Sequence, residues 1–130
     1  MKNSSTLWLV VKITAAAILL QTLFFKFSAA PESVYIFSSV GIEPWGRIGT
    51  GILELITATL ILIPRTSWIG ALLSLGLMLG AIATHLFIIG IDVLNDGGKL
   101  FALAIITLAC SVAIILHERN KIITFVKLLA

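Results

Sequence analysis

Two ionisable residues, Arg47 and Glu54, lie within an apolar run that is long enough to cross a membrane. The run covers residues 46–63 and stands between Pro44 and Pro64. Because the two residues are seven positions apart, about two helical turns, they project from one face of one helix. A carboxylate in hydrocarbon costs at least about 2.5–3.5 kcal/mol, and it normally faces a protein interior where it has a partner. Glu54 is therefore the first candidate for a functional residue.

Further polar residues are expected at a similar depth in the neighbouring apolar segments. At 1.5 Å per residue, Glu54 lies about 12 Å below the membrane surface and His85, five residues before Gly90, about 8 Å below it. A carboxyl and an imidazole in a partly hydrated pocket could carry protons or bind the oxygen atoms of a ligand. The candidates for this pocket, which opens toward the outer surface, are Glu54, His85, Arg47, Lys26 and Gln21.

A purely structural role for the same residues is the alternative. An interior ion pair or hydrogen bond between Glu54 and His85, Lys26 or Arg47 would fix the register of the helices without binding anything. We expect Gln21 to bond to a neighbouring helix, because it cannot easily reach water. Lys12 and Lys26 lie nearer the ends of the first segment, so we expect them to extend toward the two membrane surfaces.

The sequence lacks the residues and motifs of several kinds of metal, redox and catalytic site. Two histidines and the single Cys110 cannot assemble a closed zinc site, so no metal is expected. One cysteine also excludes an intramolecular disulfide and every CxxC redox motif. There is no Ser/His/Asp set, phosphate loop or GxGxxG motif, which argues against an autonomous hydrolase or nucleotide enzyme. Other enzymatic activity is left undecided.

The composition is that of an integral membrane protein. Of the 130 residues, 59% are hydrophobic and 12% are charged, against about 25% charged in soluble domains. A soluble chain of this size lacks the interior volume to bury so many apolar side chains. The net charge of +3 is spread over the segment ends, so no nucleic-acid partner is expected. We expect one membrane domain over residues 1–130, with the lipid bilayer as its surroundings.

Four segments have about the length needed to cross the hydrocarbon, at residues 7–27, 46–63, 68–90 and 100–116. The first is expected to be retained rather than cleaved as a signal peptide, because it is long and is interrupted by Lys12 and Gln21. Residues 28–45 predict a surface loop with a short interfacial helix, and residues 92–99 predict a turn. The basic and apolar tail, residues 117–130, is expected to lie along the membrane surface.

Small residues in the third and fourth segments predict close packing. Gly76 and Gly80 form a GxxxG pattern, which lets helix backbones approach one another and argues only weakly for dimerisation. Ala109 and Ala113 give the fourth segment a small-residue face.

The fold class that follows is an all-α polytopic bundle of four transmembrane helices, with both termini on one side of the membrane. Six basic residues fall on the side of the termini and three on the other, which places both termini in the cytoplasm. The six are Lys2, Lys12, Arg65, Arg119, Lys121 and Lys127, and the three are Lys26, Arg47 and Lys99. We expect the membrane to be the bacterial cytoplasmic (inner) membrane.

The arrangement of these residues resembles the DoxX and DoxX-like family of small four-helix membrane proteins over residues 7–118. The residues that carry the resemblance are Lys26-Phe27, Gly41, Arg47, Gly49, Glu54, Gly70-Ala71 and His85. The family is named after a subunit of an archaeal thiosulfate:quinone oxidoreductase, and other members are membrane partners in redox-stress complexes or assembly factors. Its fold is similar to that of vitamin K epoxide reductase-type proteins, whose cysteine pairs are absent here.

The resemblance implies a membrane partner in quinone-linked redox chemistry. A quinone would then be the ligand, Lys26, Arg47, Glu54 and His85 would line the pocket, and a redox enzyme subunit or a second copy of the chain would be the protein partner. The alternative is a non-catalytic assembly or scaffold protein whose buried polar residues only fix packing. A proton-coupled small transporter is a third reading, and it requires an oligomer because four helices alone provide no path.

Overall fold

The computed structural model describes residues 2–130, with side chains from residue 5 onward, and within that part of the chain every regular element is helical. The elements are α1 (Lys2–Phe27), α2 (Pro31–Val40), α3 (Trp45–Leu62), α4 (Ser67–Thr84), the π-helical turn η1 (His85–Ile89), α5 (Lys99–His117) and α6 (Arg119–Leu129).

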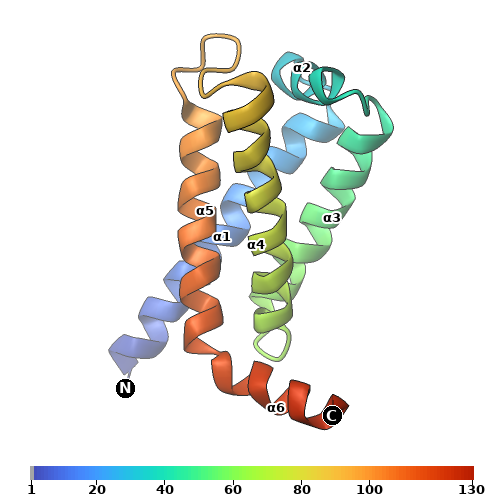
Figure 1. The fold of residues 1–130 in the computed structure, drawn as a ribbon. Helices are drawn as coiled ribbons and strands as arrows, with labels where there is room; N and C mark the ends of the chain where they lie inside the picture. Colours follow the sequence, from blue (N-terminus) through green and yellow to red (C-terminus); the bar gives the residue numbers. More distant parts are fainter. Residues whose placement is uncertain (1) are drawn as a thin grey trace.

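Four long helices form the bundle. α1 packs beside α3, α3 beside α4, α4 beside α5, and α5 beside α1, which closes the ring (Figure 1). Spans that are long and apolar enough to cross a membrane cover Ser5–Phe27, Trp45–Leu62, Ser67–Ile89 and Lys99–His117. The prediction of an all-α protein with four membrane-spanning helices is therefore confirmed.

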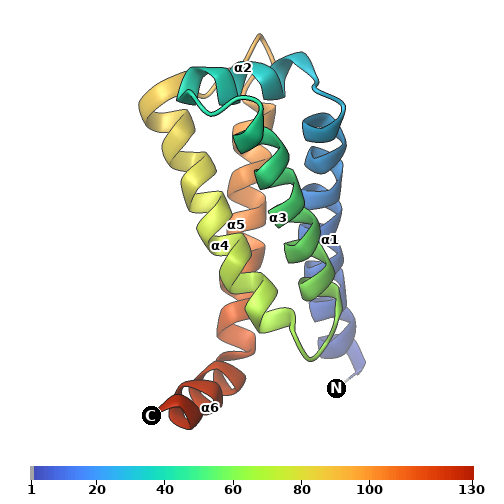
Figure 2. The same ribbon diagram turned by 90° about the vertical axis from the view of Figure 1, so that its right-hand side faces the viewer.

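The two ends of the bundle differ in what covers them. Both chain ends lie at one end, together with α6 and the turn between α3 and α4, and we name this the terminal end (Figure 1). The other end carries α2 and the loop between η1 and α5, and we name it the α2 end. α2 lies across this end of the bundle (Figure 2).

α2 is the short helix expected between the first two spans. Pro31 occupies its first turn, where a missing N–H costs nothing. Gly41 ends it with a φ of +88°, and its N–H donates to the carbonyls of Phe37 and Ser38. This left-handed closure favours glycine. It turns the chain back toward the start of α3.

The third span ends in a wider turn than a regular α-helix has. α4 stops at Thr84, and the π-helical turn from His85 to Ile89 completes the span. The N–H of Gly90 donates to the carbonyl of His85 at 2.8 Å. The predicted limits of this segment are close to those observed, but the sequence did not predict the π turn. Such turns in helices are frequent at functional sites.

The loop that follows is organised by one carboxylate. Asp96 accepts hydrogen bonds from the N–H groups of Val93, Gly98 and Leu100, at 3.0, 2.8 and 3.2 Å. It thereby caps the start of α5. Although desolvation acts to raise it, these N–H groups hold the pKa of Asp96 below its usual value. The predicted turn at residues 92–99 is confirmed.

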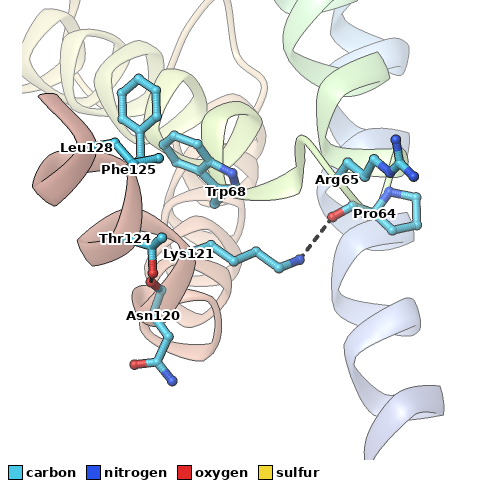
Figure 3. A pocket seen from close by; sticks show the side chains of 8 residues that line it. All are labelled: Pro64, Arg65, Trp68, Asn120, Lys121, Thr124, Phe125 and Leu128. Carbon is cyan, nitrogen blue, oxygen red and sulfur yellow. Dashed lines mark hydrogen bonds between the residues drawn. The ribbon is translucent and has the colours of Figure 1, made fainter.

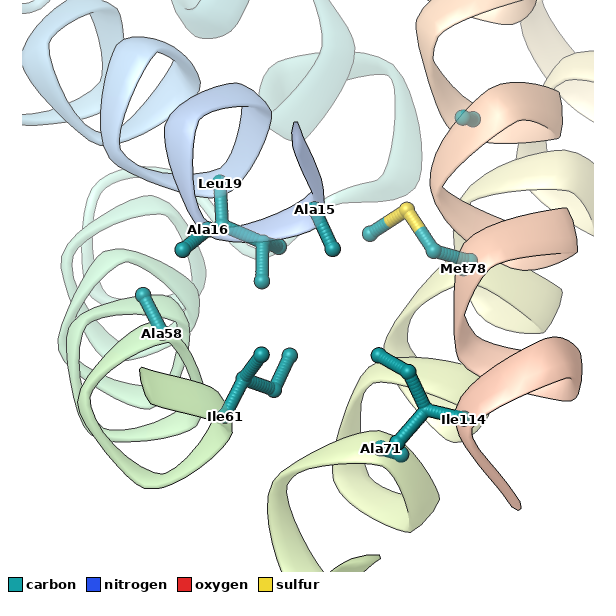
Figure 4. Close-up of a cluster of buried hydrophobic side chains, with 9 residues drawn as sticks. Ala15, Ala16, Leu19, Ala58, Ile61, Ala71, Met78 and Ile114 are labelled. Carbon is teal, nitrogen blue, oxygen red and sulfur yellow. The ribbon is translucent and has the colours of Figure 1, made fainter. Parts of the chain in front are cut away.

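The core of the bundle is made mostly of small side chains. Its buried members come from all four long helices: Ala15, Ala16, Leu19, Ala58, Ile61, Ala71, Met78, Ala104 and Ile114 (Figure 4). Ser111 adds a hydrogen bond between helices, donating to Ser74 at 2.7 Å. Small side chains bring the helix axes close together, as is typical of membrane bundles.

The glycine at which the backbones of α3 and α4 meet is not in the GxxxG pattern. A Cβ on Gly70 would stand 2.6 Å from the backbone N of Ile61, so α3 and α4 touch there. A Cβ on Gly76 or Gly80 would meet no atom within 4 Å. The prediction that Gly76 and Gly80 mediate close packing is therefore wrong within the chain. The small-residue face of the fourth span does not pack in the core either, because Ala109 is exposed and Ala113 only half-buried.

The tail folds into α6, which turns away from the bundle at the terminal end. A groove of about 570 Å³ separates it from the α3–α4 turn (Figure 3). Across this groove Lys121 donates to the carbonyl of Pro64 at 3.2 Å, and the rings of Trp68 and Phe125 lie 5.3 Å apart. The remaining basic side chains of α6, Arg119 and Lys127, are exposed.

Candidate functional site

One face of α1 carries the polar groups that enter the bundle. Lys12, Ala15, Leu19, Thr22 and Lys26 follow one another at spacings of three and four residues. This period places them in a single stripe along a helix. The middle of the stripe is buried in the core and a lysine stands at each end. Each of these lysines pairs with a different buried glutamate.

The first pair joins α1 to α3 near the α2 end. Lys26 Nζ lies 3.0 Å from Glu54 Oε1, and the Thr22 hydroxyl donates to Glu54 Oε2 at 3.1 Å. Glu54 is only 3% exposed. Lys26 thus points into the bundle, and the prediction that it extends toward the membrane surface is wrong. The buried carboxylate needs a cation beside it, which outweighs the benefit of exposing the ammonium.

Both members of this pair line a cavity of about 350 Å³ at the α2 end. α2 contributes Ser33, Ile36, Phe37 and Val40 to its lining, and Ile42 of the loop after α2 also lines it. The other linings come from all four spans: Ile18, Leu19, Thr22, Phe25, Lys26, Thr50, Glu54, Gly76, Leu77, Met78, Gly80, Ala81, Thr84, His85, Ile89, Leu100, Leu103 and Ala104. The walls are apolar except for a few polar groups, which is the usual character of a small-molecule site.

His85 lines the same cavity from the start of the π turn. The residue is 4% exposed, and its Nδ1 lies 2.9 Å from the carbonyl oxygen of Gly90. Because a carbonyl only accepts, Nδ1 carries the proton, and Nε2 of the neutral ring is then an acceptor. The ring of Phe101 holds the imidazole edge-on at 5.5 Å. The π turn therefore fixes which nitrogen of His85 can serve a ligand.

The other two candidates lie outside the cavity lining. Arg47 is buried, but its Nε donates to Glu43 at 2.8 Å and its Nη1 donates to the backbone carbonyl of Lys26. It ties the end of α1 to the start of α3 and so positions Lys26. Gln21 is exposed on α1, although the sequence predicted a contact with a neighbouring helix. Of the five candidates, the structure brings together Glu54, Lys26 and His85 around one cavity.

A second polar cluster lies at the terminal end. Lys12 Nζ is 3.0 Å from Glu118 Oε1, and Lys121 Nζ is 3.5 Å from the same oxygen. Glu118 is 6% exposed, and among the described residues its Oε2 has no hydrogen-bond partner. Beside it the indole of Trp8 stacks on the ring of His117 at 4.0 Å. This cluster joins α1, α5 and α6 without lining the cavity at the α2 end.

Sequence reasoning missed two residues of these clusters. Thr22 stands four residues before Lys26, so the helical period could have placed it beside Glu54. Glu118 gave no such signal, because it lies at the junction of α5 and α6, where the direction of a side chain depends on the bend. Among residues 5–130 no three His, Cys, Asp or Glu side chains gather where they could hold a metal ion.

The comparisons with known proteins agree with this architecture. No curated protein and no solved structure matches the chain. A sequence model of the DoxX-like family matches residues 10–114, which contain the cavity and its three ionisable residues. The match covers most of the four spans and stops before α6. This protein is therefore a membrane protein of the DoxX-like family.

Proposed function

We propose that the chain binds a quinone-like ligand in the cavity at the α2 end and serves as the membrane partner of a redox enzyme. The observation that carries the proposal is that Lys26, Glu54 and His85 line a single cavity with apolar walls. Its volume of about 350 Å³ falls within the range of about 300–1,000 Å³ of small-molecule sites. A ring with oxygen substituents fits such a lining.

The polar groups suit both redox states of a quinone. The ammonium of Lys26 can donate to a carbonyl oxygen, and Nε2 of His85 can accept from a hydroxyl. Reduction of the quinone adds two electrons and two protons and gives the two hydroxyl groups of the quinol. In this proposal the partner enzyme supplies the electrons. The two protons come from water at the α2 end and pass to the ring through Glu54 and His85, because both side chains line the cavity.

The proposed orientation places the terminal end in the cytoplasm of a bacterium and the cavity in the outer leaflet of the inner membrane. Six Lys and Arg residues belong to the terminal end and three to the α2 end, and cytoplasmic loops carry the excess of such residues. Two of those three, Lys26 and Arg47, are also paired with carboxylates inside the protein. This leaves Lys99 as the exposed cation of the α2 end.

Equilibrium binding of decylubiquinone to the protein in lipid nanodiscs tests the proposal. Glu54→Gln is expected to weaken binding at least tenfold. Glu118→Gln is the matched control, because Glu118 is also buried and also lies 3.0 Å from a lysine of α1. It is expected to leave binding unchanged. Absence of binding to the native protein, or an equal loss in both variants, would overturn the proposal.

A scaffold role is the second candidate, and one observation favours it. The carboxylate of Glu54 is satisfied within the chain by Lys26 and Thr22, so the fold needs no ligand there. In that case Lys26→Met combined with Glu54→Leu would keep the complex with a redox enzyme intact. Recovery of the partner with this double variant, together with no quinone binding by the native protein, would establish the scaffold role.

A further inference from the structure

The wall of the cavity between α3 and α4 contains two residues without side chains. Gly76 and Gly80 line the cavity, and both are also exposed on the outside of the bundle. At 100° per residue they project from the flank of α4 opposite to Met78, which faces the core (Figure 4). No atom would lie within 4 Å of a Cβ at either glycine. Between these helices the cavity therefore has an opening.

The positions of α3 and α4 explain why the opening exists. The two helices touch near the terminal end, where Gly70 meets the backbone of Ile61. From there they diverge toward α2, which lies across the wider end (Figure 2). Val40, Ile42 and Thr50 line the cavity from α2, from the loop after it and from α3, and we assign these three residues to the rim of the opening. The opening is thus bounded by α2, α3 and α4.

The rim is apolar and lies at the depth of the membrane. Gly76 and Gly80 fall in the middle of the span Ser67–Ile89. Ile42, at the α2 side of the rim, is 48% exposed. The ionisable groups, Lys26 and Glu54, stand deeper in the cavity and are buried or nearly so. The opening therefore faces hydrocarbon rather than water, because the polar side chains beside it are only the hydroxyls of Thr50 and Thr84, and that of Thr84 donates to the carbonyl of Gly80 at 2.8 Å.

We infer that the cavity takes a membrane-dissolved amphiphile, whose head group lies at Lys26 and Glu54 and whose long hydrocarbon tail leaves between α3 and α4 across Gly76 and Gly80. A cavity of about 350 Å³ holds a substituted ring but not a long chain as well. The tail must then stay outside, and backbone without side chains gives it the widest passage. This inference rests on the proposed function and specifies its ligand as a long-tailed quinone-like lipid.

A pair of probes separates this inference from the proposed function. Ubiquinone-0 has the ring of decylubiquinone without its tail, and the affinities of both for the protein in nanodiscs are compared per mole of lipid. The variant Gly76→Leu/Gly80→Leu fills the opening, and both sites have room for a Cβ. Gly49→Leu is the control, since Gly49 is exposed on α3, has the same free space and does not line the cavity.

The double variant is expected to weaken decylubiquinone at least tenfold and ubiquinone-0 less than twofold, whereas Gly49→Leu changes neither. Unchanged affinity for decylubiquinone, or an equal loss for both probes, would overturn the inference about the opening and leave the cavity as a ligand site. Failure of the native protein to bind either probe would instead overturn the proposed function. If the double variant does not fold, Ile42→Trp narrows the rim from the α2 side, with the same expected difference between the probes.

Discussion

Lys26 and Glu54 form an ion pair of 3.0 Å that joins α1 to α3 and at the same time lines the cavity at the α2 end. The pair is buried, with 14% of the lysine side chain and 4% of the glutamate side chain exposed. Removing one member of a buried pair leaves the other charged and unpaired, whereas replacing both is often neutral. Stability and binding can therefore be separated at this pair.

Lys26→Met alone is expected to lower the free energy of unfolding by about 3–5 kcal/mol. Lys26→Met combined with Glu54→Leu should recover most of that loss. Unfolding in mixed micelles measures both, with Lys127→Met on the exposed face of α6 as the control for loss of a lysine. If the single variant is as stable as Lys127→Met, the pair does not join the helices.

Gly70 and Gly76 should respond in opposite ways to the same substitution. Gly70→Ala places a Cβ 2.6 Å from the backbone N of Ile61, so α3 and α4 must separate and the protein loses stability. Gly76→Ala meets no atom within 4 Å and gains about 0.5–1 kcal/mol from the greater helix propensity of alanine. Thermal unfolding of the two variants in one detergent checks the difference. A lower unfolding temperature for Gly76→Ala than for Gly70→Ala would contradict the contact.

The hydrogen bonds by which Asp96 caps the start of α5 should be lost at low pH. Folding lowers the pKa of Asp96, chiefly through the N–H groups that outweigh its desolvation. Its contribution to stability is therefore complete above the unfolded pKa of about 3.9 and is lost as the pH falls through the lower folded pKa. Hydrogen-exchange protection of the Val93, Gly98 and Leu100 amides is expected to drop in that range. In Asp96→Asn the protection should no longer depend on pH there.

α6 should detach from the bundle when Glu118 is replaced. Its carboxylate holds Lys12 of α1 and Lys121 of α6, so Glu118→Ala removes both contacts and leaves Lys12 without its carboxylate. We expect faster hydrogen exchange in residues 119–129, with the four spans unaffected. Arg119→Ala is the control, because Arg119 is exposed beside the same bend. Equal exchange in the two variants would show that α6 is held by other contacts.

The energetic cost of placing a charge in hydrocarbon was the most useful sequence argument for locating the candidate site. The expense of a carboxylate in hydrocarbon predicted that Glu54 faces the interior and has a partner. Comparing depths predicted that His85 lies near it, and both residues line one cavity. The identity of the partner could not be predicted, since Lys26, Arg47 and His85 were all within reach. Arg47 is held instead by Glu43, which stands four residues before it, ahead of the start of α3.

The direction in which side chains point around a helix axis was predicted less well from the sequence. Depth alone grouped Gln21 with Lys26, but Gln21 precedes Thr22 by one residue and so points about 100° away from the inward stripe. The GxxxG pattern failed for a related reason, because close packing requires a second helix at that flank and α3 has already diverged there. The widened turn at His85 depends on contacts with Gly90 that no local pattern specifies.

The contact between Gly70 and Ile61 limits how the cavity can change size. Because α3 and α4 touch near the terminal end, a change in the angle between them moves their other ends the most. The largest movement is then beneath α2. A small rotation about the contact between Gly70 and Ile61 would then admit or release a molecule at the α2 end. The cluster of Lys12, Glu118 and Lys121 at the terminal end would not be disturbed. A methyl group at position 70, as in Gly70→Ala, would change the angle between α3 and α4.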